Sequence, residues 1–160
     1  TQSRSSAASD VYKRQGLVAQ AATTPTPTHA SIMTGLRVVC IDNEPAILEG
    51  MRLLLEGWGC QVICAADDRR ALAALKRAPG VPDAIIADYH LDKGNGLTAI
   101  RALRKSLKAP VKAILLTADR TMELRQQAGD IEVQVFNKPL KPAALRAWLS
   151  QIGIQRMAAE

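Results

Sequence analysis

The sequence predicts an α/β fold: a doubly wound, five-stranded parallel sheet covered by five helices. Between residues 36 and 153, five short apolar runs alternate with five segments in which apolar residues recur at every third or fourth position. Strands that alternate with helices in this way form a mostly parallel sheet with helices on both faces. Polar residues directly follow four of the apolar runs, as expected at the carboxyl ends of parallel strands, which line a crevice.

The first two strands are expected at 36–41 and 60–65, and each is followed by a helix. Asp42-Asn43-Glu44-Pro45 comes after the first strand, and its proline favours the first turn of a helix that ends near Gly57. Asp68 is the expected N-cap of the second helix, because an aspartate side chain can accept hydrogen bonds from free backbone N–H groups. Two prolines and a glycine at 79–82 end this unit.

The central strand ends in an acidic residue. Ala84-Ile85-Ile86-Ala87 lies between Pro82 and the Gly94-Asn95-Gly96 turn, and it predicts a short strand buried on both faces with Asp88 at its carboxyl end. The remaining expected elements are a helix at 96–107, a strand at 111–116, a more polar helix at 119–128, a strand at 131–136 and a helix from Pro142 to about Gly153.

Composition predicts one folded domain at 36–153 between two ends without regular structure. Residues 1–35 are rich in Ser, Thr, Ala and Pro and have no helical or strand period, so we expect a disordered linker. Within it, the stretch from Ser5 to Gln15 resembles a translated sequencing-adapter sequence, so residues 1–15 are an artefact candidate and are given no function. Residues 154–160 are expected to form a short C-terminal tail.

Composition also argues against several classes of protein. The net charge of +6 is spread over several predicted helices and aromatic residues make up only 3%, so we expect no nucleic-acid interface in this chain. No apolar run approaches the roughly 20 residues that cross a bilayer, so we expect a cytoplasmic domain that makes no membrane contact. We interpret Cys40, Cys60 and Cys64 as reduced core residues, because they lack the spacing of metal ligands.

The polar residues at the strand ends predict a single site on one edge of the sheet. They are Asp42, Asn43, Glu44, Asp88, Thr117 and Lys138. Clustered oxygen ligands suit Mg²⁺, which retains bound water. A hydroxyl and an ammonium group beside the metal could share the charge of a transferred phosphoryl group, with the carboxylate of Asp88 as the nucleophile. Each residue alone also has an ordinary structural explanation as a turn residue, a strand-end hydroxyl or a solvated charge.

Over about residues 36–153, this arrangement resembles the receiver domain of two-component response regulators. Four motifs match that family in order and spacing: Ile41-Asp42-Asn43-Glu44-Pro45, Ala87-Asp88-Tyr89 with Gly96 eight residues beyond the aspartate, Leu116-Thr117-Ala118, and Lys138-Pro139. The resemblance implies the flavodoxin-like fold of receiver domains.

The resemblance also implies a role for each site residue. Asp88 would be the phosphoacceptor, Asp42 and Asn43 the metal-site pair, Thr117 the switch hydroxyl, and Lys138 the cation that pairs with the phosphoryl group. Lys138-Pro139 would be a cis peptide bond that aims the lysine. His90 would lend its backbone carbonyl to Mg²⁺, and the side chains of His90 and Asp119 would tune the lifetime of the phosphoryl group.

Three positions depart from the family pattern. Asn43 replaces the second acid, so we expect weaker Mg²⁺ binding, which Glu44 would restore in part. Val135 stands where the family often has an aromatic switch residue, and the adjacent Phe136 should face the opposite side of its strand. Asp92 replaces a proline in the loop after the phosphoacceptor, which predicts either a looser loop or added negative potential near the metal.

The function implied by the resemblance is phosphorelay signal transduction. A histidine kinase or a histidine phosphotransfer protein would donate a phosphoryl group from its phosphohistidine to Asp88, in a Mg²⁺-dependent reaction. The receiver would catalyse only its own phosphorylation and dephosphorylation, although the parent protein could be a histidine kinase. One receiver preceded by a linker most resembles the C-terminal receiver of a hybrid sensor histidine kinase.

Other functions remain open. The chain could be a stand-alone single-domain response regulator. It could also be a pseudo-receiver, an interaction module that works without phosphorylation, and Asn43 and Val135 favour that alternative. A phosphohydrolase with an aspartyl nucleophile would need a second carboxylate two residues after the first, where this chain has His90.

Overall fold

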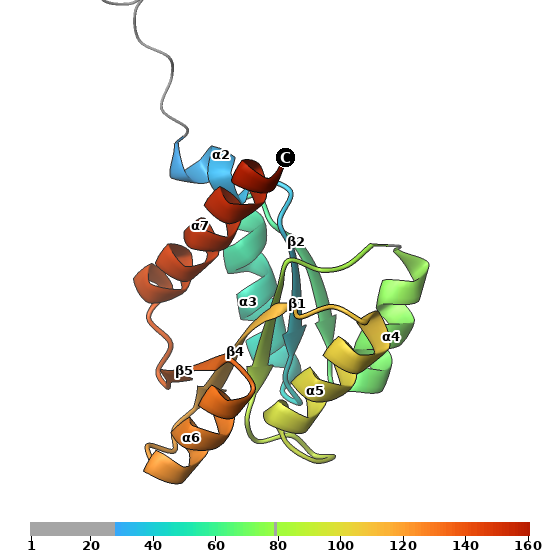
Figure 1. The fold of residues 1–160 in the computed structure, drawn as a ribbon, viewed down its shortest axis with the longest axis vertical. Helices are drawn as coiled ribbons and strands as arrows, with labels where there is room; N and C mark the ends of the chain where they lie inside the picture. The colour runs from blue at the N-terminus through green and yellow to red at the C-terminus, as the bar shows by residue number, and fades with distance from the viewer. Residues whose placement is uncertain (1–27, 79) are drawn as a thin grey trace, which may run out of the picture.

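The computed structural model describes residues 28–78 and 80–160 and has a five-stranded parallel sheet at its centre (Figure 1). The strands are β1 (Arg37–Ile41), β2 (Gln61–Ala65), β3 (Ala84–Asp88), β4 (Lys112–Thr117) and β5 (Val133–Asn137), in the spatial order β2-β1-β3-β4-β5. The helices are α2 (His29–Met33), α3 (Pro45–Gly57), α4 (Asp68–Arg77), α5 (Gly96–Leu107), α6 (Met122–Asp130) and α7 (Pro142–Ala159). The predicted fold class is confirmed, with six helices rather than five in the described part of the chain.

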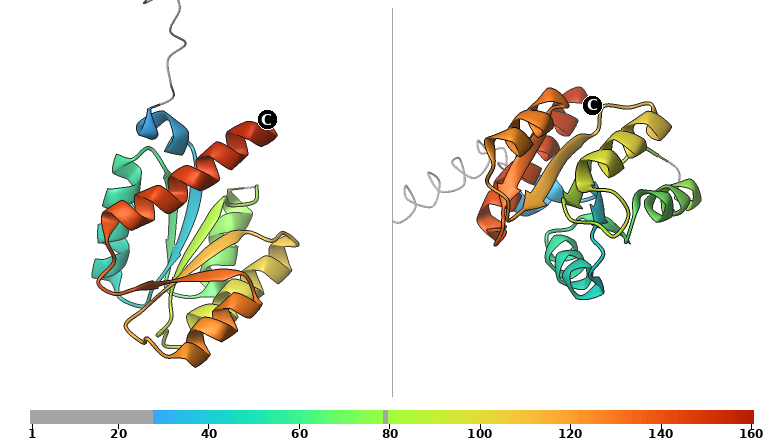
Figure 2. Two further views of the ribbon diagram at one scale, coloured as in Figure 1. Left: turned by 60° about the vertical axis from the view of Figure 1, so that its left-hand side comes forward. Right: turned by 90° about the horizontal axis from the view of Figure 1, so that it is seen from below.

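Helices cover both faces of the sheet (Figure 2, left). On one face α4, α5 and α6 pack around Ile85 and Leu115, and on the other α3 and α7 pack around Leu55 and Ile114. Successive side chains of a strand point to opposite faces, so Ile114 and Leu115 belong to different halves of the core. All residues of β3 are buried, which agrees with the prediction of a central strand enclosed on both faces.

Local signals set the starts of the helices. Pro45 lies in the first turn of α3, as predicted. A capping box opens α5: the side chain of Asn95 accepts a hydrogen bond from Thr98 N at 3.0 Å, and Thr98 Oγ1 accepts one from Asn95 N at 3.1 Å. For α4 the predicted N-cap is wrong by one residue, because Asp67 and not Asp68 accepts the hydrogen bond from Arg70 N, at 2.8 Å.

The N-terminal boundary of the folded domain differs from the prediction. Helix α2 lies inside the segment 1–35 whose composition predicts disorder, and its Met33 is fully buried. No side chain caps this short helix, so its sequence carries no start signal, and packing against α7 stabilises it instead. The rest of the predicted linker, residues 1–27 with the artefact candidate at 1–15, lies outside the described residues.

The C-terminal boundary differs as well. Helix α7 continues to Ala159 instead of ending near Gly153, so the expected tail at 154–160 is helical for all but its last residue. A Cβ atom at Gly153 would collide with the carbonyl oxygen of Ile32 in α2, so this glycine permits a close helix contact and does not stop the helix. Arg156 fixes the last turns, since its Nη1 donates to Gly35 O at 3.0 Å and lies 3.3 Å from Asp83 Oδ2.

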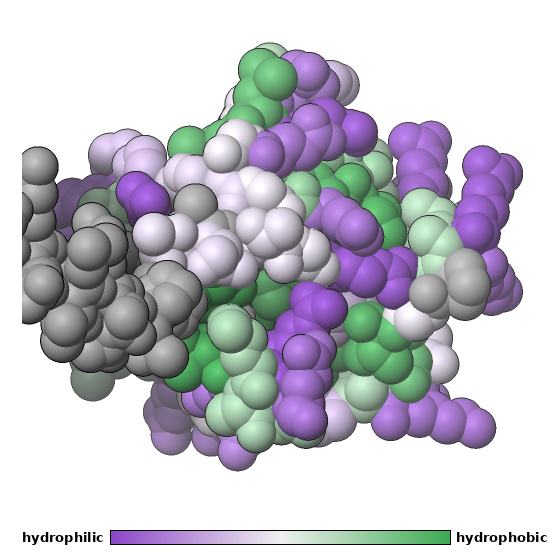
Figure 3. Space-filling model, turned by 90° about the horizontal axis from the view of Figure 1, so that it is seen from above, coloured by the Kyte–Doolittle hydropathy of each residue, from purple (hydrophilic) through white to green (hydrophobic). Residues whose placement is uncertain are grey.

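The end of the molecule that carries α2 and the C-terminus has a mixed surface. Polar and apolar side chains alternate over it (Figure 3). Ile154 and Met157 of α7 are among the exposed apolar side chains of the domain. Within residues 28–78 and 80–160, no helix is both long and apolar enough to span a bilayer.

Candidate functional site

Asp88 and Lys138 form the centre of the candidate site. Asp88 ends β3 with its side chain only 6% exposed, and the ammonium nitrogen of Lys138 lies 2.7 Å from its Oδ1. This oxygen is buried, so the carboxylate and the ammonium group form a close ion pair that is partly shielded from water. The side chain of Lys138 is 33% exposed, which leaves the site open to solvent on the lysine side.

The backbone after β5 places the lysine. Thr117 and Asn137 are register partners in the β4–β5 pair, and the backbone N–H of Lys138 donates to Thr117 O at 2.8 Å. The Lys138–Pro139 peptide bond is cis, as the resemblance implied. The strand end therefore places Lys138 so that its side chain reaches across β4 to Asp88 at the end of β3.

Asp42 is a second buried carboxylate of the same site. Its residue is 4% exposed at the end of β1, and its Oδ1 accepts a hydrogen bond from Glu44 N at 2.9 Å. Burial raises the pKa of Asp42, and the nearby charge of Asp88 raises it further, while the bond from Glu44 N and the charge of Lys138 oppose the increase. The two carboxylates and the ammonium group thus share one electrostatic environment.

The side chains of Asn43 and Asp92 form a hydrogen bond that the sequence did not predict. Asn43 Nδ2 donates to Asp92 Oδ1 at 2.9 Å, across 49 residues of sequence. The asparagine amide oxygen is then the atom left for coordination. Two residues that depart from the family pattern are therefore hydrogen-bonded to each other. Glu44 is exposed, and it contributes to the site through its backbone N–H, which donates to Asp42.

Thr117 is fully buried at the end of β4, and its Oγ1 accepts a hydrogen bond from Asp119 N at 3.0 Å. Asp119 Oδ1 in turn accepts one from Thr121 N at 2.9 Å, and Thr121 caps α6. Helix α6 accordingly begins at Met122, three residues later than predicted, because 119–121 form a hydrogen-bonded turn. The turn connects the Thr117 hydroxyl directly to the start of α6.

The remaining predicted residues lie around this centre. His90 is exposed, with its ring edge-on to that of Tyr89 at a centroid distance of 5.0 Å. A Cβ atom at Gly96 would collide with the carbonyl oxygen of Asp88, which explains why a glycine follows the aspartate at this spacing. Phe136 packs against Trp148 of α7 at 6.5 Å while Val135 packs on the other face, so the predicted opposite orientation of these two side chains is confirmed.

The donor set is compatible with a magnesium ion. Mg²⁺ needs only one or two carboxylates and completes its shell with water and carbonyl oxygens. Asp42 and Asp88 supply two buried carboxylates, and Asp88 Oδ1 has an unused lone pair. Over residues 28–78 and 80–160, no three His, Cys, Asp or Glu side chains gather closely enough to hold a metal by themselves, so Asn43, backbone oxygens and water would have to contribute.

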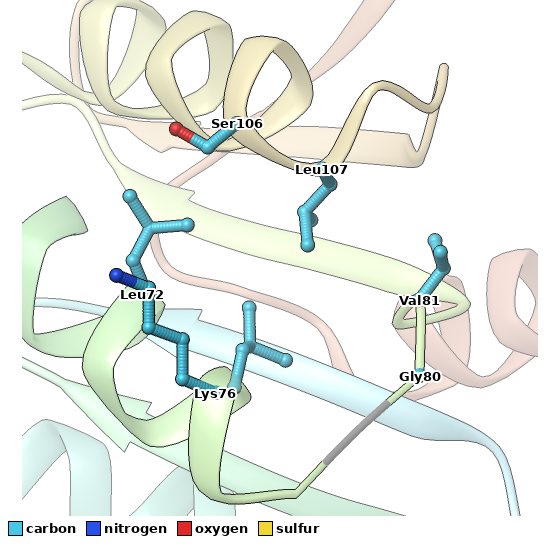
Figure 4. A pocket seen from close by; sticks show the side chains of 7 residues that line it. Leu72, Lys76, Gly80, Val81, Ser106 and Leu107 are labelled. Atoms are coloured by element: carbon cyan, nitrogen blue, oxygen red, sulfur yellow. The ribbon is translucent and has the colours of Figure 1, made fainter.

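A pocket of about 570 Å³ lies away from this site, between α4 and α5 (Figure 4). Leu72, Leu75, Gly80, Val81 and Leu107 line it together with Lys76 and Ser106. Gly80 and Val81 precede β3, so the pocket faces the opposite end of the sheet from Asp88. None of the predicted site residues lines it.

The fold and the site together define a class of protein: a doubly wound α/β domain that presents a buried carboxylate, an ammonium group and a hydroxyl on one edge of its sheet. Residues 38–150 match the family described as the response regulator receiver domain. The chain belongs to this family, and it is a receiver domain of two-component signal transduction.

Curated relatives agree with this assignment. The chain is similar to the transcriptional regulatory protein KdpE of Mycobacterium tuberculosis, with 36% identity over 115 residues that cover 69% of this chain and 49% of that protein. It is also similar to the transcriptional regulatory protein CpxR of Escherichia coli, with 31% identity over 118 residues that cover 71% of this chain and 49% of that protein. The chain thus spans about half the length of these relatives. Their names do not support the expected hybrid-kinase context.

Solved structures show the same fold. The chemotaxis protein CheY4 of Vibrio cholerae matches with a TM-score of 0.66 and 24% identity, over 74% of this chain and 99% of that one. A CheY-like receiver domain protein of Methanospirillum hungatei matches with a TM-score of 0.68 and 20% identity, over 79% of this chain and all of the other. At these identities the likeness concerns the fold alone.

Proposed function

We propose that Asp88 is a phosphoacceptor that takes its phosphoryl group from a phosphohistidine on a histidine kinase or a histidine phosphotransfer protein. A carboxylate oxygen attacks the phosphorus, the P–N bond breaks, and its electron pair returns to the imidazole nitrogen, which takes up a proton. An acyl phosphate remains on Asp88. The observation that carries the proposal is the buried carboxylate of Asp88, whose Oδ1 lies 2.7 Å from the ammonium group of Lys138.

The neighbouring residues take complementary roles in this proposal. Lys138 neutralises charge on the transferring phosphoryl oxygens, and the hydroxyl of Thr117 binds one of these oxygens once it exchanges its bond to Asp119 N. Asp42, Asn43, Asp88 and the carbonyl of His90 would hold Mg²⁺, which supplies further charge neutralisation when bound. The side chains of His90 and Asp119 would tune the lifetime of the phosphoryl group, and Glu44 and Asp92 would add negative charge nearby.

Thr117 and α6 also suggest how phosphorylation is read out. Rotation of the Thr117 hydroxyl toward the phosphoryl group would break its bond to Asp119 N and loosen the turn that starts α6. The signal would then reach the surface formed by α6, β5 and α7. Position 135, where the family often has an aromatic residue, is a valine, so it offers no aromatic ring to follow the hydroxyl.

The parent protein is a separate question, since this chain spans about half of its curated relatives. One candidate is a regulator with a further output domain, like the relatives that are named transcriptional regulatory proteins. The other candidate is a hybrid histidine kinase. In both cases this domain would lie in the cytoplasm. Reading the gene beyond both ends of this chain distinguishes them, because a kinase core upstream and an effector domain downstream have different sequences.

Phosphorylation of Asp88 is tested directly by mass spectrometry. After incubation with acetyl phosphate and Mg²⁺, the chain should gain the mass of one phosphoryl group, stable in acid and lost in base. The gain should disappear in Asp88→Asn and persist in Asp130→Asn, a matched change at an exposed aspartate at the end of α6. A gain that survives Asp88→Asn would contradict the proposal.

A pseudo-receiver is the second candidate, and the bond between Asn43 and Asp92 favours it, because that bond occupies the asparagine that replaces an acid. Absence of any mass gain at millimolar Mg²⁺ in a folded protein would support this alternative.

A further inference from the structure

Two cysteines lie side by side in the sheet. Cys40 of β1 and Cys64 of β2 are direct register partners in a parallel pair, and both side chains point to the face covered by α3. Neighbouring strands are about 4.8 Å apart, which lies within the Cα separation of about 4.4 to 6.8 Å that a disulfide spans. The register therefore already holds the Cα atoms of the two cysteines within the separation that a disulfide spans.

The two thiols have different environments. Cys40 is only 2% exposed, whereas Cys64 is partly exposed and its Sγ donates to Leu48 O of α3 at 3.6 Å. The side chain of Arg52, one helical turn after Leu48, also interacts with Cys64. Cys64 is thus the member of the pair that solvent and small reagents can reach.

The same contacts make Cys64 the more acidic thiol. A hydrogen bond from Cys40 and the positive charge of Arg52 lower the pKa of Cys64 to about 7, although burial and the carboxylate of Glu49 oppose the decrease. Cys40 is the direct register partner of Cys64 and is buried beside it. A second thiol is therefore next to the reactive one.

We propose that Cys64 is a peroxide-reactive thiol and that Cys40 resolves its oxidised form into an intramolecular disulfide. The Cys64 thiolate attacks one oxygen of hydrogen peroxide, the O–O bond breaks, and Cys64 sulfenic acid and hydroxide form. Cys40 then attacks the sulfenic sulfur; the sulfur–oxygen bond breaks, and the hydroxyl leaves as water with the proton of Cys40. Peroxide is reduced to water, and two thiols are oxidised to one disulfide.

Cys60 provides an internal comparison. It is 5% exposed, its Sγ donates to Met33 O at 3.7 Å, and burial together with the charge of Asp83 raises its pKa to about 11. Within the described part of the chain, this thiol has no cysteine as register partner, since Gln61 and not Cys60 begins β2. We therefore expect Cys60 to stay reduced under conditions that oxidise Cys64.

The pair also lies beside the candidate phosphoacceptor site. Ile41 and Ala65 are the last register partners of β1 and β2. The next residue, Asp42, still bonds to β2, because its backbone N–H donates to Ala65 O at 3.2 Å. A covalent link between β1 and β2 would constrain the strand end that carries Asp42. Any effect on phosphorylation rests on the function proposed above, whereas the thiol chemistry does not.

The first test measures alkylation of the unmodified reduced chain with iodoacetamide at pH 7, followed by peptide mapping. Thiolate fraction and nucleophilicity together predict that Cys64 reacts roughly 50- to 100-fold faster than Cys60. Equal rates for the two cysteines in the folded protein would overturn the proposal, without any substitution that could disturb folding.

The second test treats the reduced chain with hydrogen peroxide and maps its peptides. The Cys60→Ser variant should form a Cys40–Cys64 linked peptide that lacks two hydrogen atoms, and Cys64→Ser should form none. Cys40→Ser should instead accumulate Cys64 sulfenic acid, which dimedone traps. Linkage that involves Cys60, or links only between chains, would contradict the proposal, and neither result depends on phosphorylation of Asp88.

Discussion

At the scale of single residues, burial opposes the charge of the Asp42 carboxylate. Its pKa is raised above 3.8 mainly by desolvation, and in an unliganded domain only one backbone hydrogen bond and the charge of Lys138 compensate. An acid in such a place stabilises the fold poorly by itself, but it offers a partly desolvated carboxylate to a cation. The electrostatics at Asp42 are therefore better suited to binding than to stability.

Replacing Asp42 with asparagine should stabilise the metal-free domain at neutral pH. The pKa of Asp42 is higher in the folded state than its unfolded-state value of 3.8. The carboxylate therefore lowers the free energy of unfolding as the pH rises through these two pKa values, and it has no such effect below both of them. Asp42→Asn should therefore be more stable than the parent by about 1 kcal/mol at pH 7 in the presence of a chelator, with the difference shrinking toward pH 3.

Urea denaturation across this pH range measures the effect. Asp130→Asn, at an exposed aspartate, serves as the control and should show no comparable difference. A destabilised Asp42→Asn domain at pH 7 would mean that the hydrogen bond from Glu44 N outweighs the cost of burial.

At the scale of elements, the sequence predicts helices well where a local signal marks their start. Helices α3 and α5 have their predicted bounds because Pro45 and the Gly94-Asn95-Gly96 turn carry that information in the chain itself. Helix α2 was not predictable from local sequence, because its stability comes from contact with α7. Gly153 misleads for a related reason: a glycine that ends a helix and one that admits a neighbouring backbone look the same in sequence.

The same distinction applies to the candidate site. Asp88, Thr117 and Lys138 were predictable because strand ends in a parallel sheet converge on one edge, whatever the side chains do there. The bond between Asn43 and Asp92 joins two loops and depends on how each side chain turns. Only covariation between the two positions could have indicated it from sequences.

The close contact of α2 with α7 gives a prediction for Gly153. The Gly153→Ala variant places a methyl group against the carbonyl oxygen of Ile32, so it should destabilise the domain by about 1 to 3 kcal/mol and speed hydrogen exchange in α2. Gly50→Ala in α3 is the matched control: its methyl group meets no atom within 4 Å, so it should stabilise by about 0.5 to 1 kcal/mol. If hydrogen exchange in α2 were unchanged in Gly153→Ala, the contact between α2 and α7 would contribute nothing to the stability of α2.

At the scale of the whole molecule, a single sheet with a core on each face links the site to global stability. Asp42 follows β1 and Asp88 ends β3, and the residues of these neighbouring strands belong to both halves of the core. A ligand that binds only the folded arrangement of these carboxylates must therefore raise the unfolding temperature of the entire domain.

Magnesium should produce this stabilisation. At a concentration 100-fold above its dissociation constant, Mg²⁺ should add about 2.7 kcal/mol to the free energy of unfolding, because the unfolded chain lacks the site. Calorimetry with increasing MgCl₂, against KCl at equal ionic strength, measures the increase, which should be absent in Asp42→Asn. Asp92→Asn should retain part of it, since it removes a nearby negative charge but no proposed ligand. Equal responses of all three proteins to Mg²⁺ would place the bound ion elsewhere.

Helix α7 has a mechanical consequence. It starts four residues after Lys138, and its 18 residues extend about 27 Å, to the turns where Gly153 touches Ile32 and Arg156 holds Gly35. Helix α7 thus connects the loop that carries Lys138 to the opposite end of the domain. A small tilt of α7 at the lysine end would therefore also move its C-terminal turns, where Gly153 contacts Ile32 and Arg156 binds Gly35.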